Sequence, residues 1–352
     1  MQKDVFGKLE DGRSVYRHTL FNKNGFKAQI IDFGATLVAL ETPDRQGKFA
    51  DVLLGYDSLQ HYINDQSYFG SIVGRYGNRI AKGRFNLNGQ TYQLTINNGE
   101  NHLHGGLVGL NKLLWEAREI TDSSEPAVQF TCRSADGDQG YPGNVTLHVT
   151  YTLTNANELR IDYEGITDQP TILNPTNHAY FNLSGLPQET ILGHQLMIAA
   201  DRYTPVDAGL ITTGELAPVE GTPMDFRTAH TIGERIENDF EQLKFGRGYD
   251  HNWVLNDYTG AVRLAATLYD PASGRLLEVL TDQPGLQFYS GNFLDGSVVG
   301  KGGINYRFRT GLCLEAQHFP DTPNKPHFPP VTLQPGEVYR QTTIYRFSVK
   351  DE

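Results

Sequence analysis

Residues 145–163 read VTLHVTYTLTNANELRIDY, and this stretch decides the fold class. Apolar and polar residues alternate strictly on both sides of the tripeptide Asn155-Ala156-Asn157. Alternation with a period of two predicts a strand with one buried face, and Asn is typical of turns. The expected buried residues are Val145, Leu147, Val149, Tyr151 and Leu153, followed by Leu159, Ile161 and Tyr163. We therefore predict an antiparallel β-hairpin over 145–163.

The same period recurs at residues 262–268 and 343–349, whereas helical patterns are confined to the short segments 57–62 and 231–236. Many short strands need many turns, which agrees with 37 glycines and 17 prolines. No Gly/Ser-rich linker or repeat divides the chain. These features predict an all-β fold, a large antiparallel β-sandwich with a few short helices, in one domain over residues 1–352.

Bulk composition excludes several classes of function. A formal net charge of -11 argues against nucleic-acid binding, which needs clustered lysine and arginine. Cys132 and Cys313 lie in alternating apolar segments and are interpreted as buried thiols, not a disulfide. The chain lacks both a signal-peptide pattern and an apolar run of roughly 20 residues. We expect a soluble cytoplasmic protein that binds no membrane; the sequence indicates no oligomeric state.

Residues 174–182, Asn-Pro-Thr-Asn-His-Ala-Tyr-Phe-Asn, combine one titratable ring with neutral hydrogen-bonding groups. The unperturbed pKa of histidine is about 6.5, so His178 can give or take a proton near neutral pH. Asn177 and Tyr180 can orient hydroxyl groups. The mixture indicates acid-base chemistry on an uncharged, polyhydroxylated ligand, although a polar strand end with core aromatics is the structural alternative.

Two further polar segments suit the same ligand. In 74–80, Asn78 and Arg79 could hydrogen-bond to sugar hydroxyls, and in 248–253, Asp250 could accept from two vicinal hydroxyls. For 74–80 alone, a glycine-rich turn with solvated arginines is the stronger interpretation, and Asp250 could be an ordinary residue of a Gly-flanked turn.

Residues 101–106, Asn-His-Leu-His-Gly-Gly, place two histidines two positions apart. An extended backbone would aim His102 and His104 to the same side, a spacing that also suits zinc or iron if Glu315 were a third ligand. For His102 a hydrogen bond within a turn is the stronger interpretation. Glu315 interrupts an apolar strand over 312–317, and in a pocket its pKa would rise and make it a better base near neutrality.

Taken together and in this order, these segments resemble the galactose mutarotase, or aldose 1-epimerase, family. The most specific match is Asn174-x-Thr176-Asn177-His178-x-Tyr180-Phe181-Asn182-Leu183. The supporting matches are Gly74-Arg75-x-x-Asn78-Arg79-Ile80, Leu103-His104-Gly105-Gly106, Asp250-His251, Gln287-Phe288-Tyr289-x-Gly291-Asn292-Phe293 and Leu314-Glu315.

The resemblance implies a β-sandwich with a sugar cleft on one sheet and a cofactor-independent isomerase that interconverts the anomers of free aldoses such as D-galactose and D-glucose. It implies Glu315 as general base, His178 as general acid and His104 as a second imidazole near the reacting carbon. It also implies substrate-orienting roles for Asn78, Arg79, Tyr180, Asp250 and Gln287. No metal is needed for such a reaction.

Several alternatives stay open at this point. A maltose- or pentose-preferring mutarotase is the nearest, and a non-catalytic carbohydrate-binding sandwich is more distant. A metal-dependent enzyme would use His102, His104 and Glu315. A phosphosugar substrate would use Arg75, Lys82 and Arg84, whose other interpretation is solvated turn charges.

Overall fold

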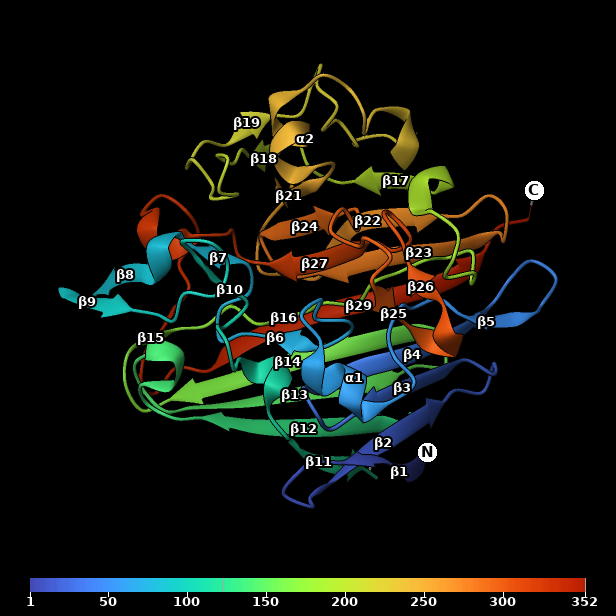
Figure 1. Ribbon diagram of the computed structural model, residues 1–352, viewed down its shortest axis with the longest axis horizontal. Helices are drawn as coiled ribbons and strands as arrows, with labels where there is room; N and C mark the ends of the chain where they lie inside the picture. The colour runs from blue at the N-terminus through green and yellow to red at the C-terminus, as the bar shows by residue number, and fades with distance from the viewer. Residues whose placement is uncertain (122, 352) are drawn as a thin grey trace.

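Three antiparallel sheets carry most of the protein in the computed structural model, which describes residues 1–121 and 123–351 (Figure 1). The nine-stranded sheet has the order β11 (Glu116–Ile120), β12 (Ala127–Ser134), β13 (Val145–Leu153), β14 (Glu158–Thr167), β29 (Tyr339–Val349), β23 (Arg275–Thr281), β22 (Arg263–Tyr269), β17 (Gln195–Ile198) and β20 (His230–Thr231). One five-stranded sheet has the order β1 (Gln2–Lys8), β2 (Ser14–Phe21), β3 (Lys27–Ile31), β4 (Thr36–Pro43) and β5 (Phe49–Asp51). The other has the order β19 (Ala217–Pro218), β18 (Arg202–Thr204), β21 (Asp250–Val254), β24 (Gly285–Tyr289) and β27 (Cys313–Gln317).

The predicted hairpin is confirmed as the third and fourth strands of the nine-stranded sheet. Strands β13 and β14 pair antiparallel from Val145 opposite Thr167 to Leu153 opposite Leu159. Burial alternates along β13 as the sequence pattern requires. The strands predicted at 262–268 and 343–349 correspond to β22 and β29.

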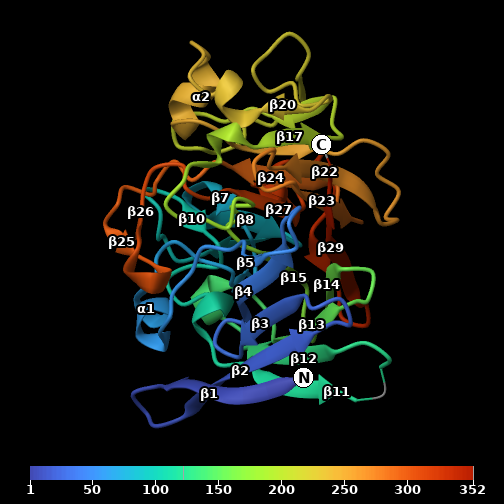
Figure 2. The same cartoon turned by 90° about the vertical axis from the view of Figure 1, so that its right-hand side faces the viewer.

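A continuous apolar core joins the three sheets. Ile30 of β3 and Val149 of β13 are fully buried in one cluster, so the first five-stranded sheet packs on the nine-stranded sheet as a sandwich. Leu277 of β23 and Leu286 and Phe288 of β24 belong to the same cluster. Figure 2 shows β1, β2 and β3 beside β11, β12 and β13. The all-β prediction is confirmed.

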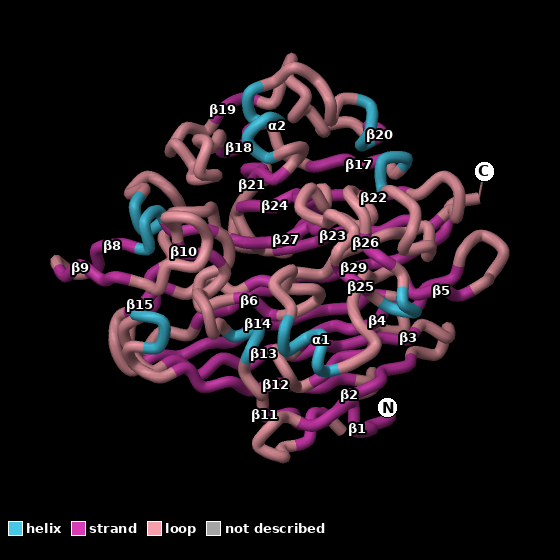
Figure 3. Tube along the Cα trace, in the orientation of Figure 1, coloured by secondary structure: helices cyan, strands magenta, loops and turns pink. Residues whose placement is uncertain are grey.

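Short two-stranded ribbons and single-turn helices fill the connections (Figure 3). The ribbons pair β6 (Ile72–Val73) with β16 (Thr176–Asn177), β7 (Arg79–Ile80) with β10 (His102–Leu103), β8 (Arg84–Leu87) with β9 (Gln90–Gln93), β15 (Thr171–Ile172) with β28 (Thr332–Leu333), and β25 (Val298–Val299) with β26 (Asn305–Tyr306). The 3₁₀ turns are Ala81–Gly83, Leu110–Lys112, Asp138–Gly140, Ile191–Gly193, Ile232–Glu234, Lys301–Gly303 and Thr322–Asn324.

The two α-helices are α1 (Leu59–Asn64) and α2 (Glu241–Gly246). The helix expected at 57–62 corresponds to α1, two residues further along. The helix expected at 231–236 is wrong, because β20 ends there and only one 3₁₀ turn follows. With six residues each, α1 and α2 cannot cross a membrane, and neither can any other helix in the described chain.

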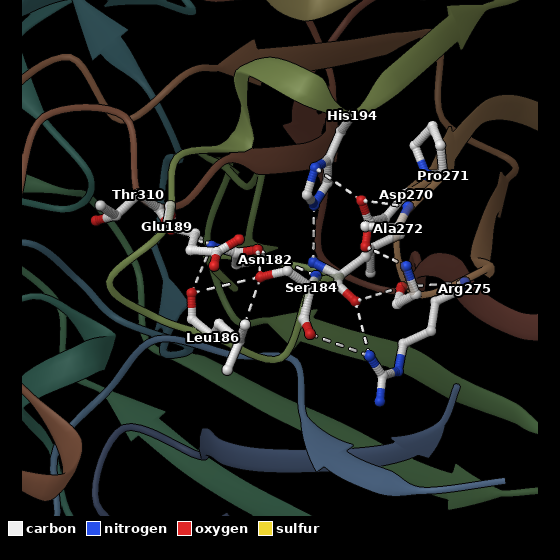
Figure 4. A network of polar contacts seen from close by, with 12 residues as sticks. Asn182, Ser184, Leu186, Glu189, His194, Asp270, Pro271, Ala272, Arg275 and Thr310 are labelled. Atoms are coloured by element: carbon white, nitrogen blue, oxygen red, sulfur yellow. Dashed lines mark hydrogen bonds and ion pairs between the residues drawn. The ribbon is translucent and has the colours of Figure 1, made fainter. Parts of the chain in front are cut away.

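A buried polar network fixes the chain just beyond residues 174–182 (Figure 4). The ring of His194 accepts a hydrogen bond of 3.0 Å from the Leu183 amide through Nε2, and its Nδ1 lies 3.8 Å from Asp270 Oδ1. The Arg275 guanidinium donates to the Leu183 carbonyl at 3.0 Å. Asn182 donates at 2.9 Å to the carbonyl of Thr310, shortly before β27. The network therefore ties the segment of His178 to the segment that leads into Glu315.

Candidate functional site

His178 and Glu315 meet because their segments share backbone hydrogen bonds. Glu315 lies at the centre of β27. Residues 174–182 run antiparallel alongside that strand, and the Thr176 hydroxyl donates to the Ala316 carbonyl at 2.8 Å. Phe181 donates to Leu312 at 2.7 Å and accepts from it at 3.0 Å. In this arrangement His178 Nε2 lies 3.7 Å from Glu315 Oε1. Two residues that are far apart in sequence thus form one titratable pair.

A cavity of about 380 Å³ opens on this pair. Its volume is near the lower end of the range for small-molecule sites, about 300–1,000 Å³, and it suits a monosaccharide. The cavity wall includes most of the residues expected from the sequence, namely Asn78, Arg79, His104, His178, Tyr180, Asp250 and Glu315. Gln287 lies behind this wall and donates to Asp250 Oδ1 at 2.7 Å.

The Glu315 carboxyl group is buried, and its Oε2 has no hydrogen-bond partner among the described residues. Burial raises the pKa of Glu315 well above its ordinary value, and the neighbouring Asp250 raises it further. Arg79 opposes this shift with its positive charge. A carboxylate with a raised pKa is a stronger base, so Glu315 is suited to accept a proton near neutral pH.

The His178 ring is also buried, and burial lowers its pKa to about 4. The ring lies 5.2 Å from the Tyr180 ring at an interplanar angle of 30° and 5.0 Å from the His104 ring at 85°. Burial disfavours the charged form of each group, raising the pKa of Glu315 and lowering that of His178. A pair that carries one proton can hold it on either group. Moving that proton to His178 gives the carboxylate and imidazolium form, which has the same total charge.

His104 enters the cavity as a hydrogen-bond donor. Its Nδ1 accepts a hydrogen bond of 3.0 Å from the Asn78 backbone amide. A neutral imidazole whose Nδ1 is an acceptor carries its proton on Nε2, and burial lowers the pKa of His104 well below its ordinary value. The tautomer is therefore set by the backbone, with Nε2–H left to donate.

This tautomer bears on metal binding. Ligand atoms of His104, His178 and Glu315 lie within 4.8 Å of one another. A metal ligand needs a free nitrogen lone pair, whereas His104 has Nδ1 engaged by Asn78 and Nε2 protonated. The donor set does not fit a metal while that hydrogen bond is present.

Arg79 and Asp250 form a charged part of the cavity wall. Arg79 Nη1 lies 3.9 Å from Asp250 Oδ2, and Arg79 Nε donates to Asn98 Oδ1 at 3.1 Å. Burial raises the pKa of Asp250, while Arg79 and Gln287 oppose the rise. A carboxyl and a guanidinium with remaining hydrogen-bonding capacity can hold neighbouring sugar hydroxyls.

Tyr180 contributes its ring to the cavity, since its hydroxyl is already donated to the Ser67 carbonyl at 2.9 Å. Three aromatic lining residues, Tyr68, Tyr289 and Phe293, received no role from the sequence, although the last two belong to the matched motif at 287–293. Tyr289 could have been found, because strand alternation places it on the same face as Gln287.

The structure corrects the expected orientation of His102. Strand β10 ends at Leu103, and His104 has φ 50°, so the extended backbone assumed from the sequence is interrupted. His102 instead contacts the Thr95 carbonyl and the Tyr141 hydroxyl, both at 2.6 Å, through its two ring nitrogens. The ligand set of His102, His104 and Glu315 is therefore not assembled.

Arg75 is not the solvated turn charge expected from the sequence. Its side chain is buried, and its guanidinium donates to the Ser134 hydroxyl and to the backbone carbonyls of Ser134, Ala135 and Pro142. Lys82 and Arg84 do not line the cavity. None of the three residues invoked for a phosphosugar, Arg75, Lys82 and Arg84, lines the cavity.

Comparison with known proteins shows the family of the chain. The family model for aldose 1-epimerase matches residues 16–346. The chain belongs to the aldose 1-epimerase family. The galactose mutarotase of Bos taurus is 46% identical over 345 residues, covering 98% of each chain. The aldose 1-epimerase of Escherichia coli K12 is 40% identical over 339 residues, covering 96% of each chain.

Solved structures of aldose 1-epimerase relatives share the fold. The aldose epimerase homologue from C. elegans superposes with a TM-score of 0.86 at 34% identity, covering 95% of this chain and 99% of that one. The galactose 1-epimerase from Lactobacillus acidophilus NCFM gives a TM-score of 0.87 at 31% identity and covers both chains completely. The family resemblance inferred from the motifs is confirmed, and with it the class of enzyme, an isomerase.

Proposed function

We propose that this aldose 1-epimerase family member is a mutarotase that interconverts the α and β anomers of free aldohexoses such as D-galactose and D-glucose. One observation carries the proposal: His178 and Glu315 lie 3.7 Å apart in a cavity of monosaccharide size. The names of the relatives, galactose mutarotase and aldose 1-epimerase, support the choice of reaction.

The reaction needs one base and one acid. With the shared proton on His178, the Glu315 carboxylate takes the proton of the C1 hydroxyl while His178 donates to the ring oxygen. The bond between C1 and the ring oxygen breaks, which leaves an aldehyde and a new hydroxyl. Rotation about the C1–C2 bond presents the other carbonyl face, and the reverse transfers close the ring. Each positioned group typically contributes about 10²- to 10⁴-fold.

The opening step removes the charge from both groups. Ring opening converts the carboxylate and imidazolium form of the pair into the neutral form, which burial favours for both Glu315 and His178. Arg79 and Asp250 bind hydroxyls on carbons other than C1, so both anomers can be accommodated, while His104 lies beside His178 near the reacting carbon.

We expect Asp250→Asn to raise KM more than it lowers kcat. The substitution removes a charged acceptor from the sugar-binding wall, and hydrogen bonds to charged groups contribute about 1.5–3 kcal/mol, or roughly 10- to 100-fold. Initial rates at several galactose concentrations measure the two constants separately. An unchanged KM would contradict a binding role for Asp250.

Polarimetry of freshly dissolved α-D-galactose and α-D-glucose tests the proposed function. The protein should speed the approach to the same final rotation, and ranking maltose and D-xylose in the same assay tests a maltose or pentose preference. Methyl α-D-galactoside is the matched control, because its C1 oxygen carries no proton and its rotation should stay constant. An unchanged rate with every free aldose would reject the proposal in favour of a binding module.

We further infer that residues 1–352 act as one domain, supported by the apolar core shared among the sheets. A cytoplasmic location, with a free aldose as the partner molecule, is part of the same proposal.

A further inference from the structure

We propose that Tyr68 is a further substrate-binding residue, whose hydroxyl hydrogen-bonds to a sugar hydroxyl other than the one on C1. The inference rests on the proposed mutarotase function and adds a residue to its site. Tyr68 lines the cavity, with its ring 4.8 Å from that of His104 and 5.8 Å from that of His178. Its side chain therefore reaches both imidazoles at the reacting centre.

The backbone of Tyr68 is held in an unfavourable conformation. Its φ of 63° lies in the left-handed region, which a bulky aromatic residue rarely adopts. One buried carboxylate holds the loop on both sides: Asp65 accepts from the Ser67 amide at 2.9 Å and from the Phe69 amide at 3.1 Å. A loop that fixes an aromatic residue in this conformation is typical of a functional position.

Further contacts fix the same loop. The Lys112 ammonium group donates to the carbonyls of Tyr62 and Ile63 at 3.1 and 2.9 Å. Ser71 Oγ donates to the Tyr68 carbonyl at 3.0 Å. The loop thus presents the Tyr68 side chain in one direction before a ligand arrives, which lowers the entropic cost of binding.

The hydroxyl of Tyr68 differs from that of Tyr180 in the same cavity. Tyr180 donates to the Ser67 carbonyl, whereas the Tyr68 hydroxyl has no hydrogen bond within residues 1–121 and 123–351. Burial raises the pKa of Tyr68 to about 12, so the group stays a phenol and can donate as well as accept. A ligand hydroxyl would supply the missing partner.

Tyr68→Phe keeps the ring and removes only the hydroxyl, so it tests the proposal directly. We expect kcat/KM for D-galactose to fall about 2- to 12-fold, the range for one neutral hydrogen bond. The same variant is then compared with the wild type on 2-deoxy, 3-deoxy, 4-deoxy and 6-deoxy sugars. For the sugar that lacks the partner hydroxyl, the two proteins should react at equal rates.

Tyr163→Phe is the matched control. The Tyr163 hydroxyl also has no partner among the described residues, but Tyr163 lies on β14 outside the sugar cavity, so its loss should leave kcat/KM unchanged. An unchanged rate for Tyr68→Phe, or an equal loss on every deoxy sugar, would overturn the proposal. If the wild type itself fails to accelerate mutarotation, the proposed function fails instead, so the two failures are distinguishable.

Discussion

Glu315→Gln should lower kcat/KM for anomer exchange by about 10²- to 10⁴-fold while leaving the fold intact, the range for a positioned general base. The amide fills nearly the same volume but cannot accept and return the proton of the C1 hydroxyl. Polarimetric rates on α-D-galactose measure the loss, and circular dichroism checks the fold. Full activity in this variant would remove Glu315 from the base role.

The same substitution has an expected effect on stability. Burial raises the pKa of Glu315 in the folded protein above that in the unfolded chain, about 4.3. The stability contributed by its proton is therefore fully present below the unfolded pKa and is lost as pH rises through the folded pKa. Glutamine has no charged form, so its burial carries no penalty from ionisation at high pH. Above neutral pH the Tm of the variant should equal or exceed that of the wild type, with the difference shrinking toward pH 4.

His178→Asn should cause a loss of similar size, because asparagine can donate a hydrogen bond but cannot transfer a proton to the ring oxygen. His104 should not substitute fully, since Asn78 holds it as a neutral imidazole. His148→Asn is a matched control. His148 lies on β13, outside the sugar cavity, and forms a hydrogen bond with the Thr131 hydroxyl. Its replacement should leave the rate unchanged. Wild-type activity in His178→Asn would contradict the acid role.

Thermal unfolding of His178→Asn adds a separate check. The pKa of His178 is lowered to about 4 in the folded protein from an ordinary value of 6.5. Its neutral form therefore contributes stability that is fully present above pH 6.5 and is lost as pH falls through about 4. The variant should lose less stability than the wild type across this interval, measured as Tm against pH.

The sequence was sufficient where chemistry follows from a local pattern. The alternation in 145–163 predicted β13 and β14, because a period of two leaves one face to bury. Most residues expected from the motifs line one cavity, including His178 and Glu315. These two lie 3.7 Å apart because distant segments pair in the fold. The motifs themselves did not show that pairing; only the family resemblance implied it.

Where the backbone departs from regular geometry, the sequence was insufficient. His104 and Tyr68 have φ angles of 50° and 63°, and no local pattern signalled either. The extended strand assumed for the metal alternative is therefore wrong, whereas His102 does form structural hydrogen bonds. Tyr68 received no role from the sequence. Arg75 shows a related limit, because its burial depends on carbonyls near Ser134 that are distant in sequence.

One proton shared between Glu315 and His178 is what the mechanism requires, and the pH dependence of kcat/KM tests this most directly. Rates on α-D-galactose, corrected for the uncatalysed reaction, should follow a bell-shaped curve. On the acid side the rate should fall near pH 4, where His178 takes up a second proton on the pair. On the alkaline side the rate should fall as pH passes the raised pKa of Glu315 and the pair loses its last proton. A rate that keeps rising with pH, with no alkaline limb, would contradict a shared proton and leave Glu315 as a lone base.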